Sequence, residues 1–138
     1  MHEQKRYPHL LDQDAPVLTA FLLQHGHDYR QVDFDVRIGT GRDPGPDYDE
    51  YIRKMALDLS RRRIDALGTG PRGTDIIEVT SDAGMTALGQ LIAYRTLWIR
   101  EHPDLDRPRI VLAARSLQTD VHQAYKEMGV VIHLYPDA

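Results

Sequence analysis

The chain has 138 residues, of which 41% are hydrophobic and 28% charged, and it carries a net charge of −4. This length suits a single domain, residues 1–138, that buries roughly two-thirds of the surface of its unfolded chain. No apolar run approaches the roughly 18 residues needed to cross a bilayer, which argues against a membrane protein. The absence of cysteine excludes disulfides and thiolate metal sites, and the net negative charge argues against a protein that coats nucleic acid through bulk charge.

The first 14 residues are polar and are expected to form an N-terminal extension. They contain no apolar segment followed by a small-residue cleavage site, so we expect no secretory signal and a cytoplasmic location. Residues 15–25 are rich in apolar side chains, which predicts a helix. Asp14 is its expected N-cap, and Gly26 follows its last turn.

Residues 31–38 alternate strictly between apolar and polar side chains, which predicts a strand with Val32, Phe34, Val36 and Ile38 on one face. Residues 39–47 contain three glycines and two prolines and are expected to be irregular. Residues 48–67 are ambiguous, because their first half could open as a helical turn whereas their second half alternates like a strand. We favour a long loop over 39–54 and a long strand over 55–67.

The rest of the chain predicts a regular order of elements. Residues 68–73 have turn chemistry, and the β-branched, apolar residues 74–80 form the next strand, so three strands make an antiparallel meander. Ser81 or Asp82 then caps a helix over 83–101, because apolar residues recur there at three- and four-residue spacing. A strand over 109–114, a helix over 117–128 ended by Gly129, and a strand over 130–135 complete the chain. The last strand is apolar and could lie at a sheet edge, where it would invite pairing with another chain.

Polar residues of this central region predict a functional site. Asp65 ends one expected strand and Glu78 lies in the next, so a tight hairpin would bring the two carboxylates together. Thr80 lies two residues beyond Glu78 on the same strand face. Gln90 and Tyr94 follow on the helix, one turn apart.

Structural explanations compete with this functional one. Asp65 follows three arginines and could form only a surface ion pair, and Gln90 and Tyr94 could be the polar edge of an amphipathic helix. Glu78 is harder to explain in this way, because a carboxylate within an apolar strand is costly to bury unless it is paired or metal-bound.

This order and these residues resemble the PD-(D/E)XK nuclease superfamily. The resemblance implies an α/β fold with a restriction-endonuclease-like αβββαβ core, an additional C-terminal helix and strand, and a mixed central sheet flanked by helices. It also implies that Asp65, Glu78 and the backbone carbonyl of Val79 bind magnesium or manganese, with DNA as the partner. Gln90 and Tyr94 match the Q-x-x-x-Y pattern of the RecB-like branch.

Two departures from that family point to a degenerate site. Thr80 stands where the family's E-x-K tripeptide has its lysine, and threonine supplies no cation. The chain has only three lysines, Lys5, Lys54 and Lys126. Only Lys54 is near an expected site strand, and Arg95 points about 100° away from Tyr94 around the helix.

The second departure concerns the first helix, where many members of the family carry a glutamate that faces the metal. No acidic residue lies within residues 15–25, and only Asp12 and Asp14 precede them. We therefore expect a nuclease-fold pseudoenzyme, a binding or structural subunit with protein partners or a homo-oligomeric state. Its resemblance to small phage-encoded proteins makes a virion or the host cytoplasm one expected location. The alternative is an active magnesium-dependent DNA endonuclease or exonuclease of the repair or resolvase type, with a relocated cation.

Overall fold

The computed structural model describes residues 10–138. The first nine residues of the expected N-terminal extension, Lys5 among them, lie outside the described residues. The elements follow in the order α1 (Ala15–His25), a 3-10 turn (Gly26–Asp28), β1 (Gln31–Ile38), α2 (Glu50–Leu59), β2 (Arg62–Gly70), β3 (Gly73–Ala83), α3 (Met85–Glu101), β4 (Arg109–Leu117), a 3-10 turn (Thr119–Val121), α4 (His122–Glu127) and β5 (Val131–Leu134). None of the helices in the described part is long and apolar enough to span a bilayer.

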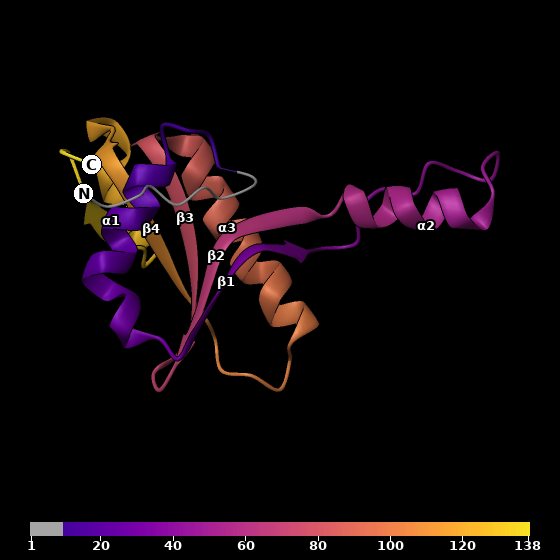
Figure 1. Ribbon diagram of the computed structural model, residues 1–138, viewed down its shortest axis with the longest axis horizontal. Coiled ribbons are helices and arrows are strands. Elements are labelled where there is room, and N and C mark those ends of the chain that lie inside the picture. The colour runs from indigo at the N-terminus through magenta and orange to yellow at the C-terminus, as the bar shows by residue number, and fades with distance from the viewer. Residues whose placement is uncertain (1–9) are drawn as a thin grey trace.

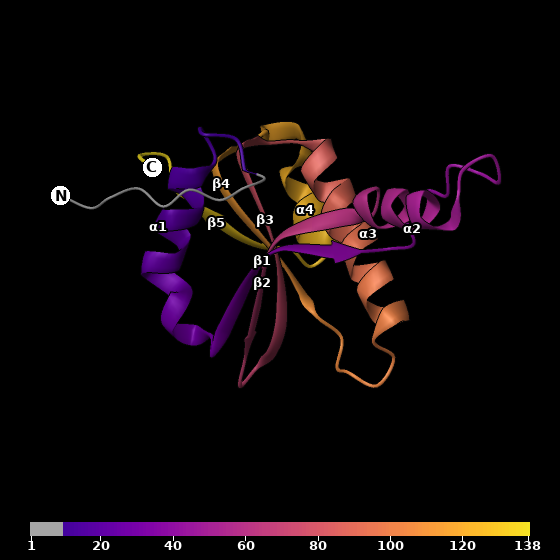
Figure 2. The same cartoon turned by 45° about the vertical axis from the view of Figure 1, so that its right-hand side comes forward.

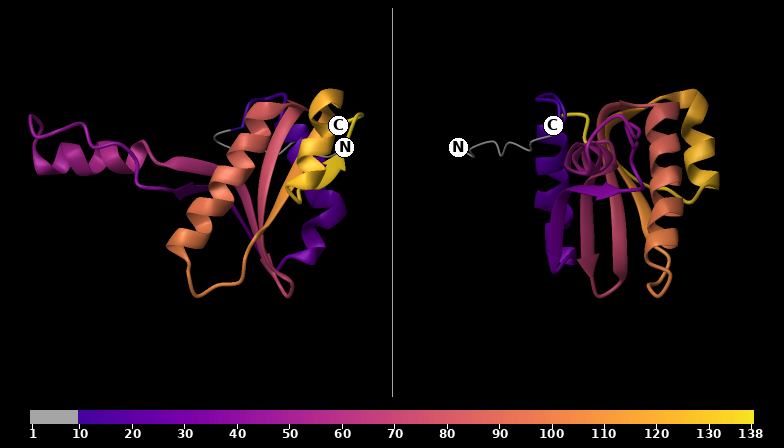
Figure 3. Two further views of the ribbon diagram at one scale, coloured as in Figure 1. Left: turned by 180° about the vertical axis from the view of Figure 1, so that it is seen from behind. Right: turned by 90° about the vertical axis from the view of Figure 1, so that its right-hand side faces the viewer.

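The described strands form one mixed sheet in the order β1-β2-β3-β4-β5. The first three strands pair antiparallel, and β3, β4 and β5 run parallel. The sheet lies between α1 on one face and α3 and α4 on the other (Figures 2 and 3). The expected αβββαβ order with an additional helix and strand is therefore confirmed. The last strand lies at a sheet edge, as predicted.

Each face of the sheet has its own hydrophobic core. Ile76, Ile110 and Leu112 belong to the core beneath α3 and α4, whereas Ile77 and Val111 belong to the core beneath α1. Neighbouring residues of one strand thus serve opposite cores, as the two-residue period of a strand requires. Burial on both faces explains why the sequences of β3 and β4 are nearly continuous apolar runs.

The first strand departs from its predicted alternation. Val32 and Phe34 pack on the core beneath α1, whereas Val36 and Ile38 belong to the core beneath α3, so the four side chains do not share one face. Between the two pairs lies Asp35, whose φ of 56° is in the left-handed region. That conformation interrupts the regular pleat, and the sequence gives no warning of it because a non-glycine residue rarely adopts it.

The long strand predicted over 55–67 is wrong, because α2 occupies Glu50–Leu59 and β2 begins only at Arg62. The loop expected over 39–54 is therefore shorter. The Asp49 carboxylate caps the helix by accepting a hydrogen bond from the Ile52 N–H at 2.8 Å. Figure 1 shows α2 at the end of the extended β1–β2 hairpin, away from the body of the molecule.

Two other boundaries differ from the prediction. Neither Ser81 nor Asp82 caps α3, because β3 continues to Ala83 and pairs there with Leu117. The Asp82 carboxylate instead accepts hydrogen bonds from the side chains of Ser116 and Gln118. The helix predicted over 117–128 is reduced to the 3-10 turn and α4, since β4 itself extends to Leu117. Parallel pairing thus extends β3 and β4 beyond the apolar segments from which the two strands were predicted.

Candidate active site

The candidate site begins where β2 and β3 separate. The two-residue turn between Gly70 and Gly73 fixes the register of the hairpin, and the paired residues run up to Ala66 and Ile77. The next position would pair Asp65 with Glu78, but the ladder stops there. The Asp65 carboxylate fills the gap by accepting a hydrogen bond from the Val79 N–H at 2.9 Å. The Asp65 side chain thus takes the place of a backbone acceptor for the Val79 N–H. The carboxylates of Asp65 and Glu78 both lie where the two strands separate.

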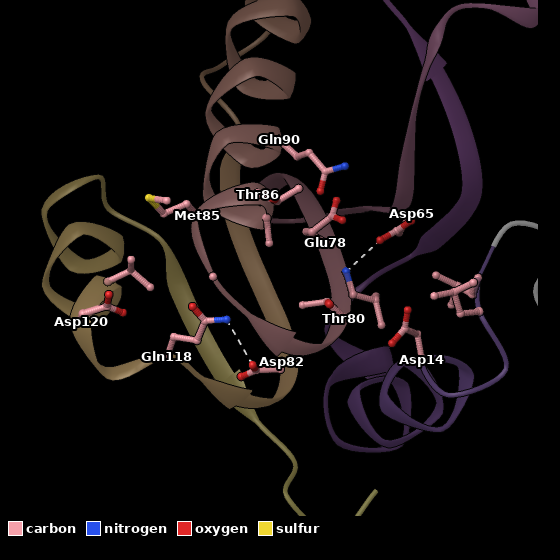
Figure 4. Close-up of a pocket in the computed structure, with 16 residues that line it drawn as sticks. Asp14, Asp65, Glu78, Thr80, Asp82, Met85, Thr86, Gln90, Gln118 and Asp120 are labelled. Atoms are coloured by element: carbon pink, nitrogen blue, oxygen red, sulfur yellow. Dashed lines mark hydrogen bonds between the residues drawn. The ribbon is translucent and has the colours of Figure 1, made fainter.

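A pocket of about 500 Å³ opens beside this separation (Figure 4). It lies at the carboxyl ends of the parallel strands β3 and β4 and at the beginnings of α1 and α3, which is where open α/β sheets bind ligands. The polar residues of its lining are Asp14, Asp65, Glu78, Thr80, Asp82, Thr86, Gln90, Gln118 and Asp120. The expectation that Asp65 and Glu78 converge therefore agrees with the structure, and Thr80 and Gln90 line the same pocket.

Glu78 is one of the two acids of the pocket that are buried, together with Asp14. Only 7% of the residue is exposed, and its Oε2 has no hydrogen-bond partner within residues 10–138. Burial, the neighbouring Asp65 charge, a side-chain hydrogen bond with Asp65 and the Asp14 charge raise the pKa of Glu78 well above its ordinary value. Burial also raises the pKa of Asp65 to about 6, against the opposing effect of its Val79 hydrogen bond. The pocket therefore holds two carboxyl groups that lack a compensating positive charge.

Asp14 is a third acid of this pocket that the sequence did not identify as a site residue. It is 7% exposed, and its carboxylate accepts a hydrogen bond from the Ser81 hydroxyl at 2.8 Å. It was expected to cap the first helix, but its side chain makes no capping bond. Its position directly before the helix was the only available signal. Asp14 thus lines the pocket from the start of α1, the helix for which the resemblance implied an acidic residue.

The two polar residues of α3 occupy different positions. Figure 4 shows the Gln90 amide pointing toward Glu78. Tyr94 lies one turn further along the helix, is buried, and does not line the pocket. Burial raises the pKa of its phenol, and the charges of Glu78 and Asp65 act in the same direction. Tyr94 therefore stays neutral, and it lies close enough to Glu78 and Asp65 to interact electrostatically with both.

No lysine, arginine or histidine lines the described part of the pocket. Lys54, the only lysine near an expected site strand, lies on α2 and lines a different cleft, so it does not replace the missing cation. Lys126 lies on α4. Arg95 points away from the pocket, as its helical position predicted, and donates to the Met128 carbonyl at 3.1 Å.

The surface ion pair considered for Asp65 is not formed, because within residues 10–138 its carboxylate bonds to the backbone of Val79 instead. Arg61 donates to the Gly39 carbonyl at 2.7 Å, and the Nε atom of Arg63 lies 3.7 Å from the Oδ1 atom of Asp35. Both arginines thus contact residues of the β1–β2 hairpin and its loop. Asp65 is therefore available to bind a ligand in the pocket.

The donor set fits a hard divalent cation that keeps part of its water shell. Within the described residues, no three acidic or histidine side chains lie close enough to enclose a metal by themselves. Magnesium does not need such a cage, because one or two carboxylates and a carbonyl suffice when waters complete the octahedron. The N–H and C=O of one strand residue point toward the same neighbouring strand, so we expect the Val79 carbonyl to face the gap that holds Asp65. The Glu78 Oε2 atom, which has no hydrogen-bond partner within residues 10–138, is the observation that fits such a cation.

Comparisons with known proteins support the fold. The chain is similar to EndoMS, solved in a complex with double-stranded DNA, with a TM-score of 0.53 and 14% identity over 98% of this chain and 48% of that chain. It is also similar to a repair endonuclease from Pyrococcus abyssi, with a TM-score of 0.50 and 13% identity over 95% of this chain and 49% of that one. The chain thus spans about half the length of either structure. No protein-family model and no curated protein matches the sequence. The chain therefore shares the fold of these two structures, a mixed sheet flanked by helices, which is the fold class that the sequence predicted.

Proposed function

We propose that this chain is a magnesium-dependent phosphodiesterase that acts on DNA. One observation carries the proposal: Asp65 and Glu78 are desolvated side by side in one pocket, and a Glu78 oxygen has no partner in the described residues. Burying two such carboxyl groups together costs stability. A bound cation would offset that cost, so the arrangement is explained by a ligand better than by folding.

The acidic residues of the pocket would bind the metal ion. Asp65, Glu78 and the Val79 carbonyl would hold the magnesium ion, and manganese could replace it because it accepts the same oxygen ligands. The ion, when bound, supplies a Lewis acid that lowers the pKa of water and neutralises charge on the phosphate. Both carboxyl groups must lose their protons first, so binding the ion releases protons at a pH near or below their raised pKa values.

The neutral groups of the pocket would position the DNA phosphate. The Gln90 amide points into the site and can donate a hydrogen bond to a phosphate oxygen or a water (Figure 4). The first turn of α3, at Met85 and Thr86, lines the same pocket and presents backbone N–H groups that have no partner within the helix. These donors and the cation must together overcome the repulsion between a phosphodiester and an acidic pocket. The likeness to a structure that contains double-stranded DNA supports DNA as the substrate.

A second candidate function is a non-catalytic binding or structural subunit, and the absence of a basic residue from the described pocket lining favours it. Thr80 takes the position of the family's lysine and offers a hydroxyl in place of a cation. Losing one preorganised donor typically lowers a rate by a factor of roughly 10² to 10³. Such a subunit could belong to a larger assembly such as a phage particle.

One experiment separates the two candidates. Purified protein is incubated with single-stranded, duplex and branched DNA in magnesium, in manganese and in EDTA, beside the Asp65→Asn variant. The phosphodiesterase proposal expects metal-dependent cleavage that Asp65→Asn abolishes. Metal binding without cleavage of any substrate would favour the non-catalytic subunit, and cleavage that survives in Asp65→Asn would point to a contaminating nuclease.

A further inference from the structure

The mixed sheet divides into two branches at the candidate site. From the hairpin turn, β2 pairs with β3 only as far as Ala66, and its remaining residues up to Arg62 pair with β1 alone. β3 continues on the other branch, where it pairs with β4. Figure 1 shows β1 and β2 turning away from β3 toward α2. Asp65 therefore lies on one branch and Glu78 on the other, and both line the pocket.

Arg62 is the first residue of β2, on the side of the sheet that faces α3. Its cross-strand partner is Ile38, and residues directly opposite each other in an antiparallel pair point to the same face. Ile38 belongs to the core beneath α3, as does Ile64, two residues from Arg62 on the same strand. Tyr94 of α3 belongs to that core as well. The Arg62 side chain therefore leaves β2 on the side from which Gln90 of α3 enters the pocket.

Arg62 is an exposed cation without a partner in the described part of the chain. Its side chain makes no hydrogen bond or ion pair within residues 10–138. The two neighbouring arginines differ in this respect, since Arg61 donates to the Gly39 carbonyl and Arg63 lies beside Asp35. An exposed arginine without such contacts adds little to the stability of a fold. Arg62 is therefore available to bind a ligand.

The charge of Arg62 acts on the same side chain as the charges of the two acids. Burial is the main reason for the raised pKa of the Tyr94 phenol. The charges of Glu78 and Asp65 raise this pKa further, and the charge of Arg62 lowers it. Such effects weaken with distance. Arg62 and the two acids thus lie around one buried phenol, although Arg62 does not line the pocket itself.

The distance between Arg62 and the acids suits neighbouring phosphates of one DNA strand. Arg62 and Asp65 are three positions apart on β2. At about 3.3 Å per residue they lie at most about 10 Å apart along the strand. Each nucleotide of a DNA strand adds about 3.4 Å along the duplex axis. A strand with one phosphate at the acids therefore brings its next phosphates, up to about the third, within this distance.

We propose that Arg62 binds a phosphate of the DNA strand that the acidic pocket holds, within about three nucleotides of the phosphate at Asp65 and Glu78, an inference that rests on the function proposed for the pocket. A planar guanidinium can donate two parallel hydrogen bonds to phosphate oxygens. The contact adds positive charge beside a pocket whose described lining has none. Because the contacted phosphate does not react, the contact stabilises the bound substrate and the transition state equally.

Binding of a fluorescent duplex of about 20 base pairs tests the proposal. Anisotropy is measured between about 50 and 200 mM KCl in calcium, which accepts the same oxygen ligands as magnesium, and a gel checks that the DNA stays intact. We expect Arg62→Ala to weaken binding roughly tenfold or more. The slope of log affinity against log salt should become shallower by about 0.9, the contribution of one phosphate contact. Arg62→Lys keeps the charge and should keep the wild-type slope.

Arg72→Ala is the matched control. Arg72 is also an exposed arginine without a hydrogen bond or ion pair among residues 10–138, but it lies in the turn between β2 and β3, at the opposite end of β2 from Arg62. Its removal changes the net charge by the same amount, and we expect affinity and slope to stay close to wild type. Circular dichroism and the melting temperature confirm that each variant folds. Equal weakening by Arg62→Ala and Arg72→Ala would assign the effect to net charge and overturn the proposal.

Two further readouts locate the contact. In cleavage assays Arg62→Ala should raise KM more than it lowers kcat, because the contact is the same in the ground and transition states. The absence of cysteine allows a photo-crosslinker to be attached at Arg62→Cys or at Arg72→Cys. We expect cross-links to DNA from position 62 and few from position 72.

The outcomes separate this contact from the function of the pocket. Wild type that binds no DNA in calcium, magnesium or manganese would overturn the proposed function and the contact together. DNA binding by wild type that Arg62→Ala leaves unchanged in affinity and in salt dependence would overturn the contact alone.

Discussion

The Asp65 carboxylate accepts a hydrogen bond from the Val79 N–H at 2.9 Å, at the point where β2 and β3 stop pairing. This one bond has two consequences. It satisfies a strand donor that has lost its backbone partner, and it holds Asp65 beside Glu78 in the acidic pocket. The candidate site therefore forms where β2 and β3 stop pairing.

Two substitutions at Asp65 should separate its structural role from its chemical role. Asp65→Asn keeps an acceptor for the Val79 N–H but removes the charge, so we expect a folded protein that no longer binds a divalent cation. Asp65→Ala also leaves the N–H unpaired, which costs about 1–3 kcal/mol. Urea denaturation in EDTA should therefore find Asp65→Ala less stable than Asp65→Asn. Equal stability of the two variants would show that the hydrogen bond contributes little.

Stability without metal should fall as the pH rises. Burial raises the pKa of Asp65 to about 6 and that of Glu78 well above its usual range. The folded state therefore holds more protons than the unfolded state above about pH 4, and the stability due to the protonated pair is lost as pH rises through the folded pKa values. For Asp65 alone the loss is up to about 3 kcal/mol. The measurement is the difference in unfolding free energy between wild type and Asp65→Asn/Glu78→Gln at pH 4, 5.5 and 7 in EDTA, and a difference independent of pH would contradict the shifts.

Introducing a cation at position 80 should increase cleavage of DNA. Thr80 lines the pocket beside the two acids, so Thr80→Lys places a fixed positive charge where the phosphate would bind. We expect an increase of roughly 10- to 1,000-fold in the metal-dependent rate. Thr96→Lys adds the same charge at an exposed site of α3 outside the pocket and should have no effect. An equal gain in both variants would mean that net charge, and not the site, controls the rate.

A partly buried network around Asp75, away from the pocket, should contribute to stability alone. The Asp75 carboxylate accepts hydrogen bonds from the Tyr29 hydroxyl at 2.7 Å and from Arg109 at 2.7 and 2.8 Å. Asp75→Ala leaves both donors without this partner, and we expect a loss of about 2–4 kcal/mol. Tyr29→Phe removes one bond and should cost about 1 kcal/mol. Denaturation curves measure both effects, while DNA binding by the folded variants should not change.

The convergence of Asp65 and Glu78 could be predicted because a short hairpin turn determines which residues of its strands face each other. Asp14 could not be assigned to the site in the same way, since it reaches the pocket only through the packing of α1 on the sheet. The α2 helix was missed because residues 55–67 alternate in a way that also suits a strand. Its Asp49 cap was the one local signal of a helix start. The break in β1 at Asp35 left no trace in the alternation of apolar residues.

The central claim is that Asp65 and Glu78 form a divalent-cation site, and manganese binding followed by electron paramagnetic resonance tests it most directly. Wild-type protein at pH 7.5 should bind manganese, magnesium should compete for the same site, and Glu78→Gln should weaken binding at least tenfold while the protein stays folded. Asp120→Asn, which alters an exposed acid at the rim of the same pocket, should bind nearly as well as wild type. Wild type that binds no manganese, or binding that Glu78→Gln leaves unchanged, would contradict the claim.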